Sequence, residues 1–500
     1  MLLPGSARAS RAGDGAPAIA NFFYQHVADP ESLFRRGAKT STRGACAPRM
    51  NSRLRAIPSV EKLLQSLGKS DLPRPIVTAL IRRELAALRK EKHIPEFELI
   101  IDQLQLALDD LCLTKIQPVV NGTGIVIHTN FGRAPFAPAL IESLSAVAAN
   151  YNNLEYDLTS GERGHRATYL EHNLAVLCGA EATTVVNNCA AALILILRHF
   201  TAKKKEVVIS RGELIQIGGG FRIPEILEAS GAKLREVGTT NKTSIEDYAR
   251  ALGPDAALIL KVHRSNFFMG GFVESPSTET LAKLARTKRI PFVEDLGSGA
   301  LVATEKVGAM EHEPTPNETL RSGVDLVCFS ADKLFGGPQA GIIAGKRRHI
   351  AALKREPFFR ALRCDKLILS ALQATVDLYL ADKSRELPAL AMLEVTADQL
   401  RVRAEALLAQ IRDLPLRSSI GEGKAQVGGG SLPRAVISSV ALDLLPDKVS
   451  VEDFAATLRR GSPPIVGYVA GGKFKLDLRT IFPRQDAQVV SALRSAAQWN

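Results

Sequence analysis

Lys333 lies in a segment whose residue types suit a covalently bound cofactor. Ser330-Ala331-Asp332 precede it, glycines follow it, and it stands 38 residues after Asp295 in the acidic strand end Val293–Gly299. A lysine amine forms an imine with the aldehyde of pyridoxal phosphate (PLP). A nearby carboxylate keeps the pyridine nitrogen protonated, so that the ring can accept electrons from a carbanion. Lys333 and Asp295 together therefore predict a PLP enzyme.

Other polar residues follow strand-like runs and can complete such a site. Asn187 and Asn188 open an apolar helix, and a helix N-terminus favours a phosphate group, although a plain helix start fits this string equally well. A serine three residues before the lysine can offer a hydroxyl to the same phosphate, and an asparagine after another strand can hydrogen-bond the ring oxygen. His263, in that second segment, suits either the site or the surface. The predicted cofactor-binding residues are Lys333, Asp295, Ser330, Asn187, Asn188 and Asn266.

The pattern from residue 116 to 365 alternates short β-branched runs with helical stretches. The runs include Thr183–Val186, Glu206–Ile209, Ala257–Leu260 and Asp325–Phe329. This alternation is typical of a mainly parallel sheet covered by helices, in which ligand groups gather beyond the carboxyl ends of the strands. We predict an α/β catalytic domain over residues 116–365 and a smaller α+β domain over residues 366–500.

Residues 50–115 predict a small helical unit with one basic face. Ten basic and four acidic residues lie between Arg53 and Lys92. The apolar residues share one face of a helix, roughly opposite the basic ones: Val77, Leu80, Ile81, Leu85 and Leu88 against Arg82, Arg83, Arg89 and Lys90. The basic face suits either solvent or contacts to phosphates. Residues 1–49 lack apolar periodicity and the core of a secretory signal, so we predict a disordered leader there.

The composition is that of an ordinary soluble protein, with 46% hydrophobic and 23% charged residues. The longest apolar run, Cys189–Leu197, is too short to span a membrane. Six cysteines form neither a disulfide framework nor a CxxC pattern, and the nine histidines are scattered, so we predict a cytoplasmic protein without a metal site. The net charge of +12 suits a polyanionic partner, although many basic proteins bind no nucleic acid.

Several further motifs occur in a fixed order along the chain. They are Ile57–Val60, Asn121–Arg133, Tyr151–Glu162, Ser210–Glu213, Phe221–Pro224, Val237–Asn241, the Lys333 segment, Arg360–Lys366, Gly428–Pro433 and Asp477–Thr480. In this order, from about residue 53 to the C-terminus, the motifs resemble those of bacterial selenocysteine synthases, the L-seryl-tRNA(Sec) selenium transferases. No single motif would be specific enough.

The resemblance implies a fold-type-I PLP enzyme, with a mainly parallel seven-stranded sheet between helices, a small C-terminal α+β domain and an N-terminal helical domain. It implies conversion of L-seryl-tRNA(Sec) to L-selenocysteyl-tRNA(Sec) with selenophosphate, through a PLP-bound dehydroalanyl-tRNA. Lys333 would then be the catalytic base. Asp332 would either assist proton transfer or hydroxyl departure, or serve as a buried ion-pair partner. The family also implies a homodecamer.

The same resemblance assigns the anionic substrates. Arginines suit a selenophosphate pocket because the planar guanidinium can donate two parallel hydrogen bonds to a phosphate-like group. The predicted selenophosphate-binding residues are Arg133, Arg360 and Arg363. The family grips its tRNA with the N-terminal domain, by shape and phosphate contacts. The predicted tRNA-binding residues are Arg53, Arg55, Arg82, Arg83, Arg89 and Lys90.

The chain departs from the family pattern at three positions, where the family commonly has alanine, asparagine and glycine. They are Gly122, Cys189 and Ala331, and the last would crowd its turn if that position needed a positive φ. Two alternatives stay open on sequence grounds. One is a PLP lyase acting on a small phosphorylated amino-sugar acid. The other is a non-catalytic RNA-binding relative, which the intact Lys333 and Asp295 disfavour.

Overall fold

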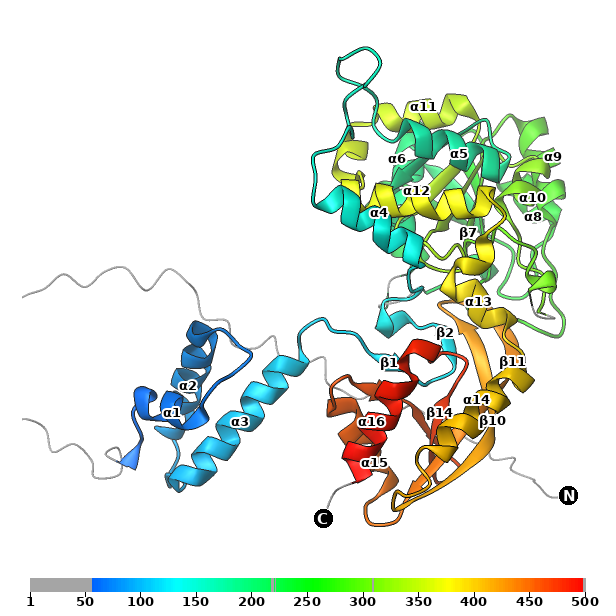
Figure 1. Ribbon diagram of the computed structural model, residues 1–500. Coiled ribbons are helices and arrows are strands. Elements are labelled where there is room, and N and C mark those ends of the chain that lie inside the picture. The colour runs from blue at the N-terminus through cyan, green and yellow to red at the C-terminus, as the bar shows by residue number, and fades with distance from the viewer. Residues whose placement is uncertain (1–55, 217–219, 221, 308–309, 498–500) are drawn as a thin grey trace, which may run out of the picture. The chain divides into compact units, whose positions relative to one another are not determined.

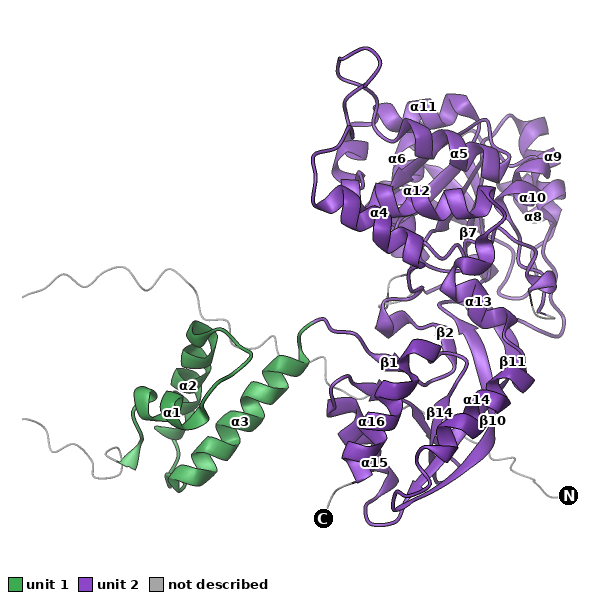
Figure 2. Cartoon of the chain, in the orientation of Figure 1, with its two compact units in different colours: residues 1–115 green, residues 116–500 purple. Residues whose placement is uncertain are grey.

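The computed structural model describes residues 56–216, 220, 222–307 and 310–497. The chain divides into two compact units, residues 1–115 (unit 1) and 116–500 (unit 2) (Figure 2). The predicted leader and the predicted tRNA contacts Arg53 and Arg55 lie outside the described residues. None of the helices in the described part of the chain combines the length and the apolarity needed to span a bilayer.

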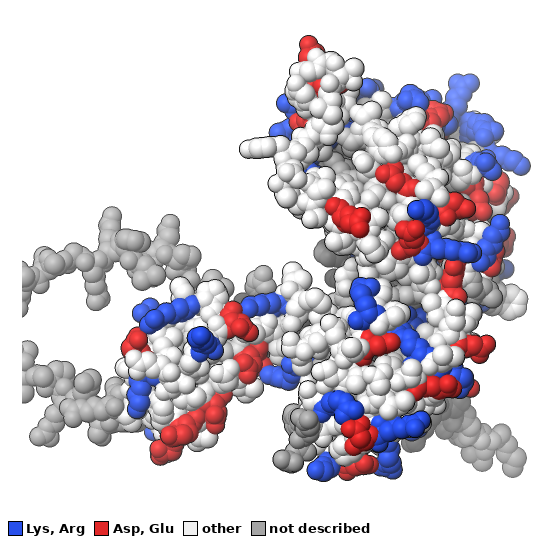
Figure 3. Space-filling view, viewed as in Figure 1, with Lys and Arg blue, Asp and Glu red and all other residues white. Residues whose placement is uncertain are grey.

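The described part of unit 1, residues 56–115, contains three helices: α1 (Val60–Leu67), α2 (Arg74–Leu88) and α3 (Phe97–Leu113). Ser59 caps α1, because its side chain accepts a hydrogen bond from the Lys62 N–H. The apolar faces of the helices form one small core that includes Leu63, Ile81, Leu85, Ile100 and Leu104. The predicted basic residues Arg82, Arg83, Arg89 and Lys90 are exposed. Acidic side chains gather along α3 instead (Figure 3).

The centre of unit 2 is a seven-stranded sheet, which confirms the predicted fold class. Its strands lie in the order β3-β9-β8-β7-β6-β4-β5, and only β9 runs antiparallel to its neighbours. The strands are β3 (Ala182–Val186), β4 (Glu206–Ser210), β5 (Lys233–Val237), β6 (Ala256–Val262), β7 (Phe292–Gly297), β8 (Leu326–Ser330) and β9 (Gly341–Gly345). The middle strands are buried on both faces, because helices cover both (Figure 1).

Each face of this sheet has its own set of helices. One face packs against α6 (Cys189–Phe200), α7 (Ile223–Ala229) and α11 (Arg347–Arg355). The opposite face packs against α5 (Thr168–Cys178), α8 (Ile245–Ala251), α9 (Thr278–Lys288), α10 (Pro316–Arg321) and α12 (Lys366–Leu380). An additional helix, α4 (Pro138–Ala148), lies against α12, where Ser143 and Ser370 share a hydrogen bond of 2.6 Å.

A second sheet, in the order β13-β14-β11-β10-β2, forms the smaller α+β part. Its strands are β2 (Ile125–Ile127), β10 (Leu416–Gly428), β11 (Ser431–Pro446), β13 (Tyr468–Ala470) and β14 (Lys473–Asp477). The helices of this part are α13 (Pro388–Glu394), α14 (Ala397–Ala409), α15 (Val451–Arg460) and α16 (Asp486–Ala497). Strand β1 (Val120–Asn121) pairs separately with β12 (Ile465–Val466). The strands β1 and β2, which the sequence placed with the catalytic domain, thus pair with C-terminal strands.

The motif Asp477–Thr480 links the second sheet to α13 and to the turn before β2. Buried Arg479 donates to the carbonyls of Met392 and Val395 at 2.7 Å and of Ser438 at 2.6 Å. The Thr480 hydroxyl accepts from the Gly124 N–H at 3.0 Å. One arginine therefore links α13, the segment after it and β11, and its neighbour anchors the turn before β2.

We expect Arg479→Met to destabilise the protein by about 3 kcal/mol, because one buried and two partly buried carbonyls lose charged donors. The exposed Arg385, which pairs with Glu394 at 3.2 Å, is the matched control. Arg385→Met should cost about 1 kcal/mol or less. Urea unfolding curves measure both variants, and equal shifts would contradict the structural role of Arg479.

Candidate active site

Lys333 lies in the turn that joins β8 to β9. The turn is fixed by backbone hydrogen bonds from Ala331 N–H to Ala340, from Gly337 N–H to Ala331 and from Leu334 N–H to Ser298, of 2.9, 2.8 and 3.1 Å. Ala331 does not belong to the described residues with positive φ, so its side chain does not strain the turn. The left-handed conformation falls instead on Gly336, with φ 75°.

Asp295 lies on β7, the strand beside β8, and the structure brings it close to Lys333. A Cβ built on Gly297 would lie 3.9 Å from Lys333 Nζ and 3.3 Å from Ser265 Oγ. Burial raises the pKa of the Asp295 carboxyl, while the positive charge of Lys333 and a hydrogen bond from the Gly297 N–H of 3.0 Å lower it. The amine, the carboxylate and a glycine-lined space thus meet at the carboxyl ends of β7 and β8.

Two cysteines border the same carboxylate, and the sequence did not point to either as a site residue. Cys189 Sγ lies 3.5 Å from Asp295 Oδ1, and Cys328 pairs in register with Asp295 on the adjacent strand. One ligand atom from each of the three lies within 4.8 Å of the others, which is a possible metal cluster. A hydrogen bond to Cys189 and burial raise the pKa of Cys328 well above its usual value. In the metal-free protein the Cys328 thiol is therefore held in its protonated form.

The start of α6 lies at the same edge of the sheet. Asn188 caps the helix, because its side chain accepts from the Ala191 N–H at 2.8 Å. Asn187 is exposed, and its N–H donates to the Leu362 carbonyl at 2.9 Å, which ties α6 to the short helix η7 (Pro357–Leu362). A Cβ at Gly341 would lie 2.2 Å from the Asn188 carbonyl, so only glycine permits this approach. Ser330 is buried at the end of β8.

The segment after β6 forms another side of the site. The Asn266 side chain donates to the Gln216 carbonyl at 2.8 Å, and its Cβ lies 3.1 Å from a Cβ built on Gly430. The β10–β11 turn of the smaller part therefore closes on Asn266. The His263 backbone N–H donates to the Asp295 backbone carbonyl at 2.8 Å. The His263 ring Nε2 lies 3.1 Å from an oxygen of buried Glu313.

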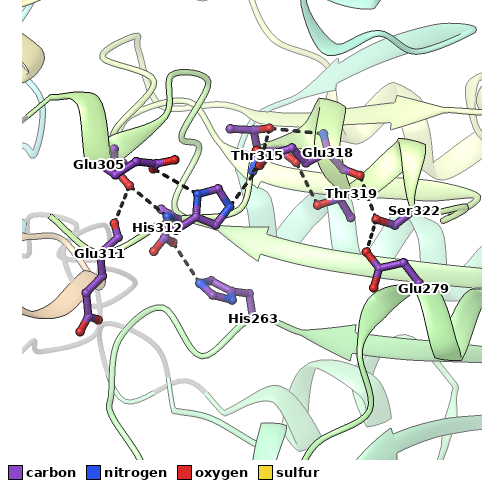
Figure 4. A network of polar contacts seen from close by, with 11 residues as sticks. His263, Glu279, Glu305, Glu311, His312, Thr315, Glu318, Thr319 and Ser322 are labelled. Carbon is purple, nitrogen blue, oxygen red and sulfur yellow. Dashed lines mark hydrogen bonds and ion pairs between the residues drawn. The ribbon is translucent and has the colours of Figure 1, made fainter.

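His263 borders a polar network whose members lie in the segments 304–305 and 311–322 and on α9 (Figure 4). His312 lies between Glu305 and Glu318, at 3.1 and 3.4 Å. Glu318 also caps α10 through Thr315, and Ser322 donates to Glu279 at 2.9 Å. Through His263 this network supports the backbone next to Asp295.

The predicted anion-binding arginines lie in two groups. Arg133 Nη1 lies 2.6 Å from one oxygen of buried Asp332, while the other Asp332 oxygen has no hydrogen-bond partner among the described residues. Arg360 is exposed on η7. Arg363 and Arg166 approach the same oxygen of Glu155, at 3.6 and 3.3 Å. The sequence missed Arg166 and Glu155, because nothing in their spacing relates them to a residue 200 positions later.

The chemistry of these groups fits PLP. Three polar atoms around Lys333 are buried without a hydrogen-bond partner among the described residues: Asn266 Oδ1, Ser298 Oγ and Asp332 Oδ1. The Lys333 amine can bind the aldehyde of PLP, and the Asp295 carboxylate can pair with its ring nitrogen. The N–H groups at the start of α6 can bind its phosphate. Any side chain at position 297 would occupy the space next to Lys333 Nζ that glycine leaves open.

Another buried carboxyl, Glu213, lies in the loop after β4. One of its oxygens accepts from the Val262 N–H at 3.0 Å. Burial raises the pKa of Glu213 to about 7, although the Val262 N–H and the positive charge of Lys261 lower it. Arg211, in the same loop, is exposed and bonds Glu236 at 2.7 Å.

Comparison with known proteins relates the chain to one family. A family model described as L-seryl-tRNA selenium transferase matches residues 119–482. The L-seryl-tRNA(Sec) selenium transferase of Carboxydothermus hydrogenoformans is 44% identical over 446 residues, which cover 86% of this chain and 95% of that protein. The protein of the same name from Aquifex aeolicus is 42% identical over 440 residues, covering 87% and 96% of the two chains.

Among solved structures, the chain resembles a D-glucosaminate-6-phosphate ammonia-lyase. The TM-score is 0.55 at 22% sequence identity, and the match covers 77% of this chain and 96% of that one. This likeness shows the shared fold alone. The much higher identity to the selenium transferases disfavours the lyase alternative.

The raised pKa of Glu213 predicts a pH-dependent stability. Between the ordinary value of 4.5 and about 7, the folded state binds more protons at this site than the unfolded state, so stability falls as the pH rises through that window. The loss amounts to about 3 kcal/mol and is complete above the folded pKa. Glu213→Gln should therefore lose less stability than the wild type between pH 5 and pH 8.

Urea unfolding at the two pH values measures this difference. Glu225→Gln, at an exposed position, is the control and should follow the wild type. Parallel curves for the wild type and Glu213→Gln would show that Glu213 ionises normally in the folded protein.

Proposed function

Because the chain belongs to the L-seryl-tRNA selenium transferase family, we propose that it converts L-seryl-tRNA(Sec) to L-selenocysteyl-tRNA(Sec). Selenophosphate would be the selenium donor, and PLP would be the resident cofactor. The observation that carries it is the approach of the Lys333 amine to Gly297 beside the buried carboxylate of Asp295. In the net reaction the serine Cβ–O bond is replaced by a Cβ–Se bond, and the donor leaves as phosphate.

When bound at Lys333, PLP supplies an electron sink that stabilises negative charge at the serine Cα. Asp295 would hold the ring nitrogen, and its own charge is stabilised by the Cys189 thiol and the Gly297 N–H. The Lys333 amine would act as the base that takes the Cα proton and later returns one. Asn187, Asn188 and Ser330 would bind the phosphate, and Asn266 the ring oxygen.

Asp332 lies next to the base and offers two roles at once. One oxygen is held by Arg133 at 2.6 Å, and the other is buried and free of hydrogen bonds among the described residues. The free oxygen can orient the departing serine hydroxyl, which leaves as water. The ion pair would hold Arg133 next to Lys333, where an anionic donor would enter.

Arg133, Arg360 and Arg363 are our proposed hosts for selenophosphate. The Leu362 carbonyl accepts from the Asn187 N–H, so the loop carrying Arg360 and Arg363 lies against the start of α6. Arg363 retains a buried Nε without a partner in the described part of the chain, which leaves a donor for an anion.

The basic residues of unit 1 are proposed to contact tRNA phosphates. Arg82, Arg83, Arg89 and Lys90 are exposed on or just after α2. We also propose a homo-oligomer, a decamer by family likeness. Large exposed apolar side chains on and near α4, α5 and α12 support an interface: Ile141, Tyr151, Tyr169, Val176 and Leu367.

Selenium transfer to tRNA tests the function directly. Purified protein with PLP, seryl-tRNA(Sec) and labelled selenophosphate should yield selenium-labelled tRNA, and Lys333→Ala should lower the rate by at least about 1000-fold. Lys346→Ala, a lysine paired with Asp325 at the far end of β9, should retain the wild-type rate. A folded, PLP-loaded wild type that transfers no selenium would refute the proposal.

Arg360→Lys tests the anion pocket. Lysine keeps the charge but loses the two-pronged geometry, so the KM for selenophosphate should rise roughly 10- to 100-fold while that for seryl-tRNA stays constant. The exposed Arg355 on α11 provides the matched control, Arg355→Lys. An unchanged selenophosphate KM in Arg360→Lys would remove this residue from the pocket.

A further inference from the structure

The segment from His263 to Ser275, which follows β6, carries two exposed phenylalanines. Phe268 is 54% exposed and Phe272 is 87% exposed. In contrast, phenylalanines of the core such as Phe292 and Phe329 are fully buried. Two exposed rings within five residues form an apolar surface that folding of this unit does not explain.

The backbone around both rings is held in place, and each ring has a cation beside it. The Arg434 guanidinium lies 3.9 Å from the centre of the Phe268 ring and is itself ion-paired with Glu311. The Asn241 side chain donates to the Phe272 carbonyl at 2.6 Å, and Lys242 Nζ lies 6.0 Å from the Phe272 ring. The rings are therefore presented on an anchored loop.

This surface begins next to the reactive lysine. Ser265 Oγ and Lys333 Nζ both approach the same point above Gly297, at 3.3 and 3.9 Å. Phe268 follows Ser265 by three residues, which is at most about 10 Å of extended chain. Phe268 therefore lies within reach of the Lys333 amine, on the same segment as Asn266, and Phe272 follows four residues later.

We propose that the unpaired 3′ end of the aminoacyl-tRNA binds on this surface, with its terminal bases stacked on Phe268 and Phe272. The inference rests on the proposed function, because the serine is esterified to the terminal ribose and must reach Lys333. The last nucleotides then have to lie within one or two nucleotide lengths of the site. Bases of any identity stack on aromatic rings, and the adjoining phosphates require cations.

The charge of the surroundings favours this occupant over a second copy of the chain. Lys242 and Arg434 border the rings and are each paired with a carboxylate, Glu274 and Glu311, while Arg264 lies on the same segment as the rings. Arg264 donates to Ser275 at 3.0 Å and to the Met269 sulfur at 3.8 Å, with no carboxylate partner among the described residues. A polyanion with stacking bases matches both the rings and the cations.

Steady-state kinetics separates stacking from simple packing. Phe272→Leu keeps an apolar side chain but removes the π-face, and it should raise the KM for seryl-tRNA roughly 5- to 100-fold. Phe272→Trp should restore the wild-type KM, and the KM for selenophosphate should not change in either variant. Equal seryl-tRNA KM values for the wild type and Phe272→Leu would overturn the inference.

A binding experiment makes the inference independent of catalysis. Uncharged tRNA with a complete 3′ end is compared with the same tRNA lacking its last three nucleotides. The wild type should bind the complete tRNA more tightly, and Phe272→Leu should bind the two equally. This result would support the surface even if no selenium transfer were detected, whereas equal discrimination by both proteins would refute it.

Arg434→Ala tests the cation beside Phe268, and Arg417→Ala is its matched control. Both arginines lie on the β10–β11 hairpin and pair with a carboxylate, but Arg417 pairs with Asp447 at the opposite end. Only Arg434→Ala should weaken binding of the complete tRNA and make the tRNA affinity less dependent on salt concentration. Sedimentation decides the remaining alternative: if Phe272→Leu dissociates the assembly, the rings are a contact between copies and the inference fails.

Discussion

Everything in the active site depends on keeping one buried carboxylate charged. Asp295 lies in a low-dielectric environment that raises its pKa, yet its proposed partner is a protonated ring nitrogen that requires the ionised form. The protein offsets the cost of burial with several small contributions: the charge of Lys333, the Gly297 N–H and the neighbouring thiols. None of these donors is strong alone. Their arrangement requires β7, β8 and the start of α6 to meet at one edge of the sheet.

The smaller part of unit 2 completes the site rather than merely adjoining it. Gly430 in the β10–β11 turn lies against Asn266, and Arg434 on the same hairpin reaches Phe268 and Glu311. The hairpin can do this because Arg479 and Thr480 fix its sheet to α13 and to the turn before β2. Polar groups far along the chain thereby position the hairpin against Asn266 and Phe268.

The sequence predicted what local pattern determines. β-Branched runs identified the strands of the parallel sheet, and a lysine 38 residues after an aspartate predicted the chemistry at their carboxyl ends. Local pattern could not reveal contacts set by strand register or by distant loops. Cys328 faces Asp295 only because the two strands pair in that register, and Glu155 meets Arg363 only through the folding of two separate loops. Strand β2 was missed because three residues carry too little pattern.

The pairing of β2 with β10 has a consequence for how the protein is made. Ile125 pairs with Gln426, so the partner of β2 leaves the ribosome about 300 residues later. At ordinary rates of synthesis this delay is roughly 15–60 s, far longer than a hairpin needs to form. The large sheet can assemble while translation continues, but the smaller one cannot close until nearly the whole chain exists. A nascent chain thus carries an unpaired strand through most of its synthesis, at the stage when such edges invite association with other chains.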